Sequence, residues 1–366
     1  MDTAVKEIVQ RAHSKNDEIR KTKRLEAQSG RRNLSKSDFK QEISEKEVKT
    51  LSNLCKSGKL STDQFRDLSQ ALSSKPEFSK DFMNSDGCLH SLIGWLSGKD
   101  PPRQLLALQC LVNLSAQGYK GPLLAKSAGA YLITLISGTN QNLAEFSCNA
   151  MSNLAMKDRL SVPVLLNLEA VPTLLNLAQT SSGTPQESAL QAIYNLIKTE
   201  NMTYDVLRQL TTASIRMLSV RPPIHLLWLL YSLSANQTLH NFLANRSFLH
   251  QCVDIATYEI FQKCDSRPLV KLLTPVVRIL ANLSAGPDSV SVCLCLVRHP
   301  DFPAILTALL STNYLHLCRE SLWLFANIVN NESVTVQEEF VNLDLMDKLE
   351  THAVHAVGRL DPYALA

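Results

Sequence analysis

Apolar residues recur at spacings of three and four along most of the chain beyond residue 60, and this pattern predicts a succession of amphipathic helices. The first helix begins at Ser61-Thr62-Asp63 and places Phe65, Leu68 and Leu72 on one face. It ends before Pro76, because proline disfavours helical geometry in the residue that precedes it. Many short helices of this kind must stack on one another to bury their apolar faces.

The predicted helices fall into units with a common order. Residues 171–178 form one helix, residues 179–185 a polar turn rich in serine, glycine and proline, and residues 186–198 a second, more apolar helix. The same order recurs at 87–116, 128–156 and 302–330, and the helices predicted at 334–341 and 345–357 open a further unit that has no third helix. An array of helical repeats is therefore predicted over residues 60–357.

Each unit closes with a similar short phrase, in which a polar residue is followed by leucine or isoleucine. The central positions of the phrase are Asn113, Asn153, Asn195, Ser232, Asn282 and Asn327, at steps of 40, 42, 37, 50 and 45 residues. Self-similarity at roughly 40–47 residues is typical of armadillo and HEAT solenoids, which expose an extended binding face. The low glycine and aromatic content, 12 residues and 6%, also favours an all-helical protein.

The amino-terminal segment differs from the array in its charge. Residues 1–50 contain 13 lysines and arginines and 9 acidic residues, whereas the rest of the chain contains 24 and 25. Helices are predicted over 4–13 and 17–28, but residues 1–60 carry few large apolar side chains and cannot fold alone. We expect a mobile basic segment, and its charge is typical of a segment that binds nucleic acid, a membrane surface or an acidic protein.

Composition argues against several other classes of protein. The nine cysteines form no Cys-x-x-Cys pair, which favours reduced, buried thiols and a cytoplasmic or nuclear protein, and Cys293, Cys295 and His299 lie among apolar residues rather than in a metal-site pattern. No signal peptide and no apolar run of about 18 residues is present, so no membrane association is expected. Phosphate-binding loops, nucleophile elbows and zinc-protease helices are lacking too, so we expect neither an enzyme nor a cofactor or metal site.

Two passages give the chain a closer resemblance to one family. Residues 319–328 read Arg-Glu-Ser-Leu-Trp-Leu-Phe-Ala-Asn-Ile. They resemble the pattern Glu-Ala-Cys-Trp-x-x-Ser-Asn-Ile of importin-α, the armadillo adaptor that binds nuclear localisation signals. Trp323 and Asn327 lie four residues apart and therefore share a helix face. In the family, this asparagine binds the backbone of the signal peptide and this tryptophan packs on its lysine stems.

The second passage is basic. Residues 18–24, Glu-Ile-Arg-Lys-Thr-Lys-Arg, and residues 31–35, Arg-Arg-Asn-Leu-Ser, resemble the importin-β-binding segment of importin-α. The resemblance implies that importin-β is bound by Arg20, Lys21, Lys23, Arg24, Arg31 and Arg32. It also implies that Arg31 and Arg32 can fold back into the groove of the adaptor itself.

The resemblance further implies a right-handed superhelical armadillo solenoid of about six repeats plus a partial seventh. Its cargo-peptide site would consist of Asn113, Asn153, Asn195, Asn282, Glu320, Trp323 and Asn327. The family tryptophan is replaced by Gln109, Asn149, Gln191 and Arg278 in four units, and the Trp228 unit has Ser232 in place of asparagine. For the asparagines the alternative is surface polarity of the helix or a local hydrogen bond between repeats. For Trp323 the alternative to the groove is core packing, and for Trp228 core packing is the favoured interpretation.

The function predicted from these observations is a nuclear import adaptor in the cytoplasm and nucleus. Its partners would be importin-β, through residues 1–50, and basic cargo peptides, through the groove. The alternative is an armadillo interaction scaffold that has lost signal-peptide binding, which the missing tryptophans favour. Nucleic-acid binding by the basic segment is a third interpretation that we do not favour, and it predicts a steep dependence on salt.

Overall fold

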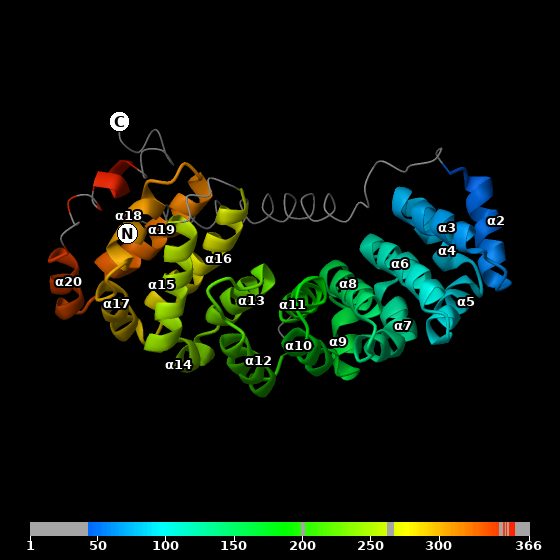
Figure 1. Cartoon of the computed structure of the whole chain (residues 1–366), viewed down its shortest axis with the longest axis horizontal. Coiled ribbons are helices and arrows are strands. Elements are labelled where there is room, and N and C mark those ends of the chain that lie inside the picture. The colour runs from blue at the N-terminus through cyan, green and yellow to red at the C-terminus, as the bar shows by residue number, and fades with distance from the viewer. Residues whose placement is uncertain are drawn as a thin grey trace, which may run out of the picture. The chain divides into compact units, whose positions relative to one another are not determined.

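The computed structural model describes residues 43–198, 202–261, 267–343, 347, 349 and 351–355. The chain divides into two compact units, Met1–Glu45 and Lys46–Ala366. The predicted helices over 4–13 and 17–28 and the basic passages lie outside the described residues. All the regular elements in the described part of the second unit are helical (Figure 1).

The second unit repeats one arrangement, in which one to three helical segments precede the helix that closes each unit, called the third helix here. Each third helix packs against the third helix of the unit before it, so these helices lie side by side along the array (Figure 1). The third helices are α3 (Thr62–Ser74), α6 (Pro101–Gln117), α8 (Gln141–Lys157), α11 (Thr184–Leu196), α13 (Ile224–Ser234), α16 (Arg267–Ser284) and α19 (Leu315–Val329).

The remaining helices precede or follow these in each unit. They are α2 (Glu45–Lys56), α4 (Pro76–Asn84), α5 (Cys88–Gly94), η2 (Trp95–Ser97), α7 (Gly121–Ile136), α9 (Ser161–Asn167), α10 (Ala170–Thr180), α12 (Tyr204–Arg216), η3 (Gln237–Leu239), α14 (His240–Leu243), α15 (Arg246–Phe261), α17 (Ser289–Val297), α18 (Phe302–Leu310) and α20 (Val334–Val341). Of the predicted final helix at 345–357, the described residues 347, 349 and 351–355 are helical.

Local sequence signals explain where several helices begin. Ser61 caps α3, and its side chain and that of Gln64 form a reciprocal capping box with the backbone. Asn140 accepts hydrogen bonds from two backbone N–H groups in the first turn of α8. Pro76 opens α4 directly after α3 ends at Ser74, which confirms the break predicted there.

One continuous apolar core runs through the array rather than a separate core in each unit. Its largest fully buried side chains include Phe65, Phe82, Phe248, Phe302 and Phe340, which come from helices spread from α3 to α20. Burying one such side chain stabilises the fold by about 1.5–3 kcal/mol. Each unit therefore depends on its neighbours for stability, as expected of a solenoid.

The array begins earlier than the predicted boundary at residue 60. Helix α2 buries Val48, Leu51 and Cys55, which lie three, four and seven residues apart on one face. The helix is fixed to α5, because the Cys88 thiol lies 3.5 Å from the Ser52 carbonyl oxygen and the Ser91 hydroxyl donates to the Lys56 carbonyl at 3.1 Å. The expectation that residues 1–60 lack a packed structure is therefore wrong for residues 46–56.

Helical units whose third helices stack on one another identify the fold as an all-α, armadillo-like superhelical solenoid, which confirms the predicted fold class. In the described ranges, none of the helices taken alone is long and apolar enough to cross a membrane. Two bent helix pairs, α9 with α10 and α17 with α18, meet the criteria of length and composition only when each pair is taken together.

Candidate functional site

The faces of the third helices that carry the repeated polar position are called the ladder face here. Its positions are Asn113, Asn153, Asn195, Ser232, Asn282 and Asn327. In the structure, the amides of all five asparagines donate to the third helix of the preceding unit. Asn113 donates to Ser69, Asn153 to Val112 and Ser115, Asn195 to Ser152, Asn282 to Ser234, and Asn327 to Ala281 and Ser284. The amides thus form a seam between successive units.

Two of these asparagines are buried completely. Asn153 has 0% exposure and donates to the Val112 carbonyl at 3.0 Å, while Asn195 has 3% exposure and donates to the Ser152 hydroxyl at 2.9 Å. Neither Oδ1 atom has a hydrogen-bond partner within the described part of the chain. In this conformation the side-chain N–H₂ groups of Asn153 and Asn195 donate to the neighbouring unit rather than to a bound peptide.

The other three asparagines are half-buried and keep part of their surface on the ladder face. The Asn113 amide donates to the Ser69 carbonyl at 2.7 Å, and the Asn282 amide donates to the Ser234 hydroxyl at 2.9 Å. The Asn327 amide donates to the Ala281 carbonyl at 2.8 Å. These side chains combine a seam contact with some access to a ligand.

The serines that receive these hydrogen bonds were not identified from the sequence. Ser69, Ser115, Ser152, Ser234 and Ser284 are all buried. A signal was present, because Ser115, Ser234 and Ser284 each lie two residues after a ladder position, and Ser152 directly precedes one. A recurring small polar residue inside an apolar helix needs a hydrogen-bond partner, and the neighbouring repeat supplies it.

Glu320 was expected to contact a cargo peptide, but it forms an ion pair within the chain. Its Oε1 atom lies 2.5 Å from Nη2 of Arg278, and the two side chains are only 17% and 11% exposed. Burial alone would lower the pKa of Arg278, but the hydrogen bond and the negative charge of Glu320 raise it, so the guanidinium stays charged. The pair joins α16 to α19.

Aromatic residues surround this pair on the ladder face. The Arg278 guanidinium carbon lies 5.4 Å from the ring centroid of Tyr231 and 5.8 Å from that of Trp228. Trp228 is half-buried and its ring also lies near Tyr194, at 6.4 Å. Lys198 places its ammonium 4.0 Å from the Tyr194 centroid. This row of rings on α11 and α13 therefore already holds two cations that belong to the chain.

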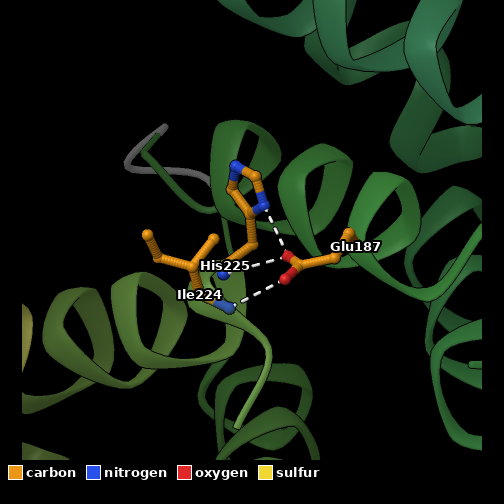
Figure 2. A network of polar contacts seen from close by, with 3 residues as sticks. All are labelled: Glu187, Ile224 and His225. Carbon is orange, nitrogen blue, oxygen red and sulfur yellow. Dashed lines mark hydrogen bonds and ion pairs between the residues drawn. The ribbon is translucent and has the colours of Figure 1, made fainter. Parts of the chain in front are cut away.

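A second carboxylate on a third helix is also used within the chain. Glu187 of α11 accepts hydrogen bonds from the backbone N–H groups of Ile224 at 2.8 Å and His225 at 3.2 Å, and its Oε2 atom lies 2.7 Å from His225 Nδ1 (Figure 2). Burial alone would raise the pKa of Glu187, but the contacts with His225 and Ile224 outweigh burial and lower it. Glu187 thus caps the amino terminus of α13.

The accessible part of the ladder face lies at α19. A cavity of about 470 Å³ opens between the end of α16, the start of α17 and α19, and its lining includes Trp323, Asn327, Val290 and Glu332. The Trp323 side chain is 58% exposed, so it is not a core residue. The cavity combines an indole, a half-buried amide and an exposed carboxylate, which together suit a positively charged side chain on an extended chain.

The described cysteines do not line the α19 cavity. The eight that the structure describes are free thiols, and all but the half-buried Cys295 are buried. Burial, aided by the nearby Cys88, raises the pKa of the Cys55 thiol to about 12, which makes it inert as a nucleophile. Across the part of the chain that the structure describes, no three histidine, cysteine or acidic side chains are placed to hold a metal ion.

No protein-family model matches the chain. It is similar to the crystal structure of an engineered protein, at 14% identity and a TM-score of 0.50, over 86% of this chain and 91% of that chain. A designed armadillo repeat protein in complex with the peptide (KR)4 matches at 16% identity and a TM-score of 0.45, over 78% and 99% of the two chains. The likeness to the engineered protein concerns the fold alone.

Proposed function

We propose that this protein is a peptide-binding armadillo scaffold that holds an extended basic segment of a partner protein against α19. The observation that carries the proposal is the cavity at Trp323, where a largely exposed indole faces open space beside Asn327 and Glu332. A tryptophan exposed to this degree contributes little to the core, and aromatic residues are frequent anchors of binding sites.

The cavity suits a lysine or arginine side chain better than an apolar one. The indole can pack on the methylene stem and attract the cation, which is worth about 0.5–2 kcal/mol. Glu332 adds negative charge at the same opening. Since the solenoid face exists before binding, only the peptide has to become ordered, and this reduces the entropic cost of binding.

Replacing Trp323 with alanine tests this proposal. We expect the dissociation constant for an octapeptide of alternating lysine and arginine, measured by isothermal titration calorimetry, to rise at least about tenfold, because the indole supplies both the packing surface and the cation–π attraction. The melting temperature should change little, since the side chain is 58% exposed.

Leu315→Ala is the matched control, because Leu315 is 49% exposed on the same helix and does not line the cavity. It should bind the octapeptide as the unmodified protein does. Equal affinity of the Trp323→Ala variant and the unmodified protein would rule out the cavity as the peptide site.

A second candidate function is that of a nuclear import adaptor, shuttling between cytoplasm and nucleus. The basic passages at residues 18–24 and 31–35 favour it, because their order and spacing resemble an importin-β-binding segment. In this proposal the segment recruits importin-β while the α19 cavity holds a basic cargo peptide. Protein rather than nucleic acid is the expected partner of the basic residues.

Binding of importin-β to a peptide of residues 1–50 tests the adaptor proposal. We expect submicromolar affinity, and we expect replacement of Arg20, Lys21, Lys23, Arg24, Arg31 and Arg32 by alanine to abolish it. A peptide with the same composition in scrambled order controls for simple charge attraction. If the scrambled peptide binds equally well, or if neither binds, the adaptor proposal fails and the peptide-binding scaffold stands alone.

A further inference from the structure

Three ladder-face side chains surround the guanidinium of Arg278. Trp228 and Tyr231 on α13 present their rings to it, with centroids at 5.8 and 5.4 Å, and Glu320 on α19 lies 2.5 Å away. These three side chains are called the arginine cradle here. The cradle is formed by α13 and α19, and its occupant Arg278 belongs to α16, the third helix that lies between them.

The cradle has the composition of a binding site for a positively charged side chain. It offers aromatic surface for the stem, rings for the cation and a carboxylate for an ion pair, and these are the groups by which proteins recognise arginine. The cavity at α19 offers the same combination through Trp323 and Glu332, but without an occupant from the described part of the chain. The arginine cradle and the α19 cavity lie on the same ladder face, and Arg278 already occupies the cradle.

The buried ion pair of Arg278 with Glu320 also carries a desolvation cost, which is not expected of a residue that serves stability alone. Arg278 is 11% exposed, and its Nε atom is buried with no hydrogen-bond partner among the residues that the structure describes. Desolvating an ion pair is expensive, and an apolar side chain of similar length fills such a space at least as well. A charged side chain at this position therefore calls for a reason beyond packing.

We propose that Arg278 acts as a built-in ligand of the arginine cradle and determines which peptides the ladder face accepts, by keeping basic side chains of a partner out of the middle of the face. This inference rests on the proposed peptide-binding function. A bound segment places a basic side chain at Trp323 and a neutral one where it passes α13 and α16. The face then selects a single basic cluster rather than a long basic run.

The test removes Arg278 from the arginine cradle in a variant whose α19 cavity lacks Trp323. In the Trp323→Ala background, Arg278→Met removes the occupant but keeps an unbranched side chain of similar length. We expect the octapeptide of alternating lysine and arginine to bind this double variant at least about tenfold more tightly than the Trp323→Ala variant, by isothermal titration calorimetry. Adding Glu320→Gln should abolish the gain, because the carboxylate is the partner of the incoming cation.

Two further variants keep the result interpretable. Arg278→Lys retains a cation in the cradle and should show no gain, while Arg278→Gln offers a polar alternative if the methionine variant does not give the helical circular dichroism of the folded protein. If the folded Arg278→Met and Arg278→Gln variants bind the octapeptide no better than the Trp323→Ala variant, the inference is overturned. Failure of the α19 site itself is seen separately, as equal affinity of the Trp323→Ala variant and the unmodified protein.

Discussion

Replacing Glu320 with alanine is expected to lower the free energy of unfolding by about 3 kcal/mol. The substitution leaves the guanidinium of Arg278 at 11% exposure with no carboxylate beside it, and its Nε atom already lacks a partner among the described residues. Breaking a buried pair by removing one member costs about 3–5 kcal/mol, because the remaining charge stays desolvated. Denaturant unfolding followed by circular dichroism measures the loss.

Two comparisons separate this effect from a general loss of helix stability. Glu332→Ala removes an exposed carboxylate beyond the end of the same helix, and its effect should stay within about 0.5 kcal/mol. The double replacement of Arg278 and Glu320 by methionine should recover most of the loss, since an apolar pair carries no desolvated charge. A loss below about 1 kcal/mol for Glu320→Ala would mean that Arg278 regains its solvation by moving into water, and that the pair does not hold α16 to α19.

The helices could be predicted from the sequence because each depends on neighbouring residues. Periodic apolar positions, the cap at Ser61 and the break before Pro76 act within one or two turns, and the structure has α3 and α4 where these signals place them. Helix α2 was missed because Val48, Leu51 and Cys55 are separated by charged and polar residues in a segment with little apolar content overall. Its stability comes from packing on α5, which the local sequence does not encode.

The candidate site was harder to predict, because its side chains can face either a ligand or a neighbour. The spacing placed Trp323 and Asn327 on one helix face, and the structure places both in one cavity. The spacing could not show that Glu320 pairs with Arg278, since these residues are 42 positions apart and meet only through the register of α16 against α19. The inward direction of the asparagine amides depends on the same register.

Polar residues of the ladder face contact either the neighbouring unit or an open cavity, and these two roles divide the face into two parts. From α6 to α16, amides and carboxylates are largely committed to contacts between units, as with Asn153, Asn195 and Glu187. At α19 an indole and an exposed carboxylate face a cavity instead. A bound peptide would therefore gain most of its affinity at one end of the array, in contrast to a face on which every unit contributes one ligand contact.

The buried amide seam should prove more important for stability than for binding. Asn195→Asp keeps the shape of the side chain but replaces the amide N–H₂, which donates to the Ser152 hydroxyl at 2.9 Å, by a carboxylate oxygen at a position with 3% exposure. We expect the free energy of unfolding to fall by about 3 kcal/mol at pH 7, because the new carboxylate oxygen faces the Ser152 backbone carbonyl, which lies 3.3 Å from the replaced nitrogen and can only accept, and because a charge is buried without a basic partner. Denaturant unfolding measures the change.

The pH dependence of that loss follows from burial of the introduced carboxyl group. Burial raises the pKa of this group above its value in the unfolded chain, so the folded state takes up a proton first as the pH falls. The deficit should therefore shrink as the pH is lowered from neutral toward the pKa of the unfolded chain, about 4. Asn176→Asp, at an exposed position on α10, should change stability by no more than about 0.5 kcal/mol throughout. If Asn195→Asp instead leaves stability intact and abolishes octapeptide binding, the amide contacts the ligand and the seam is not its main role.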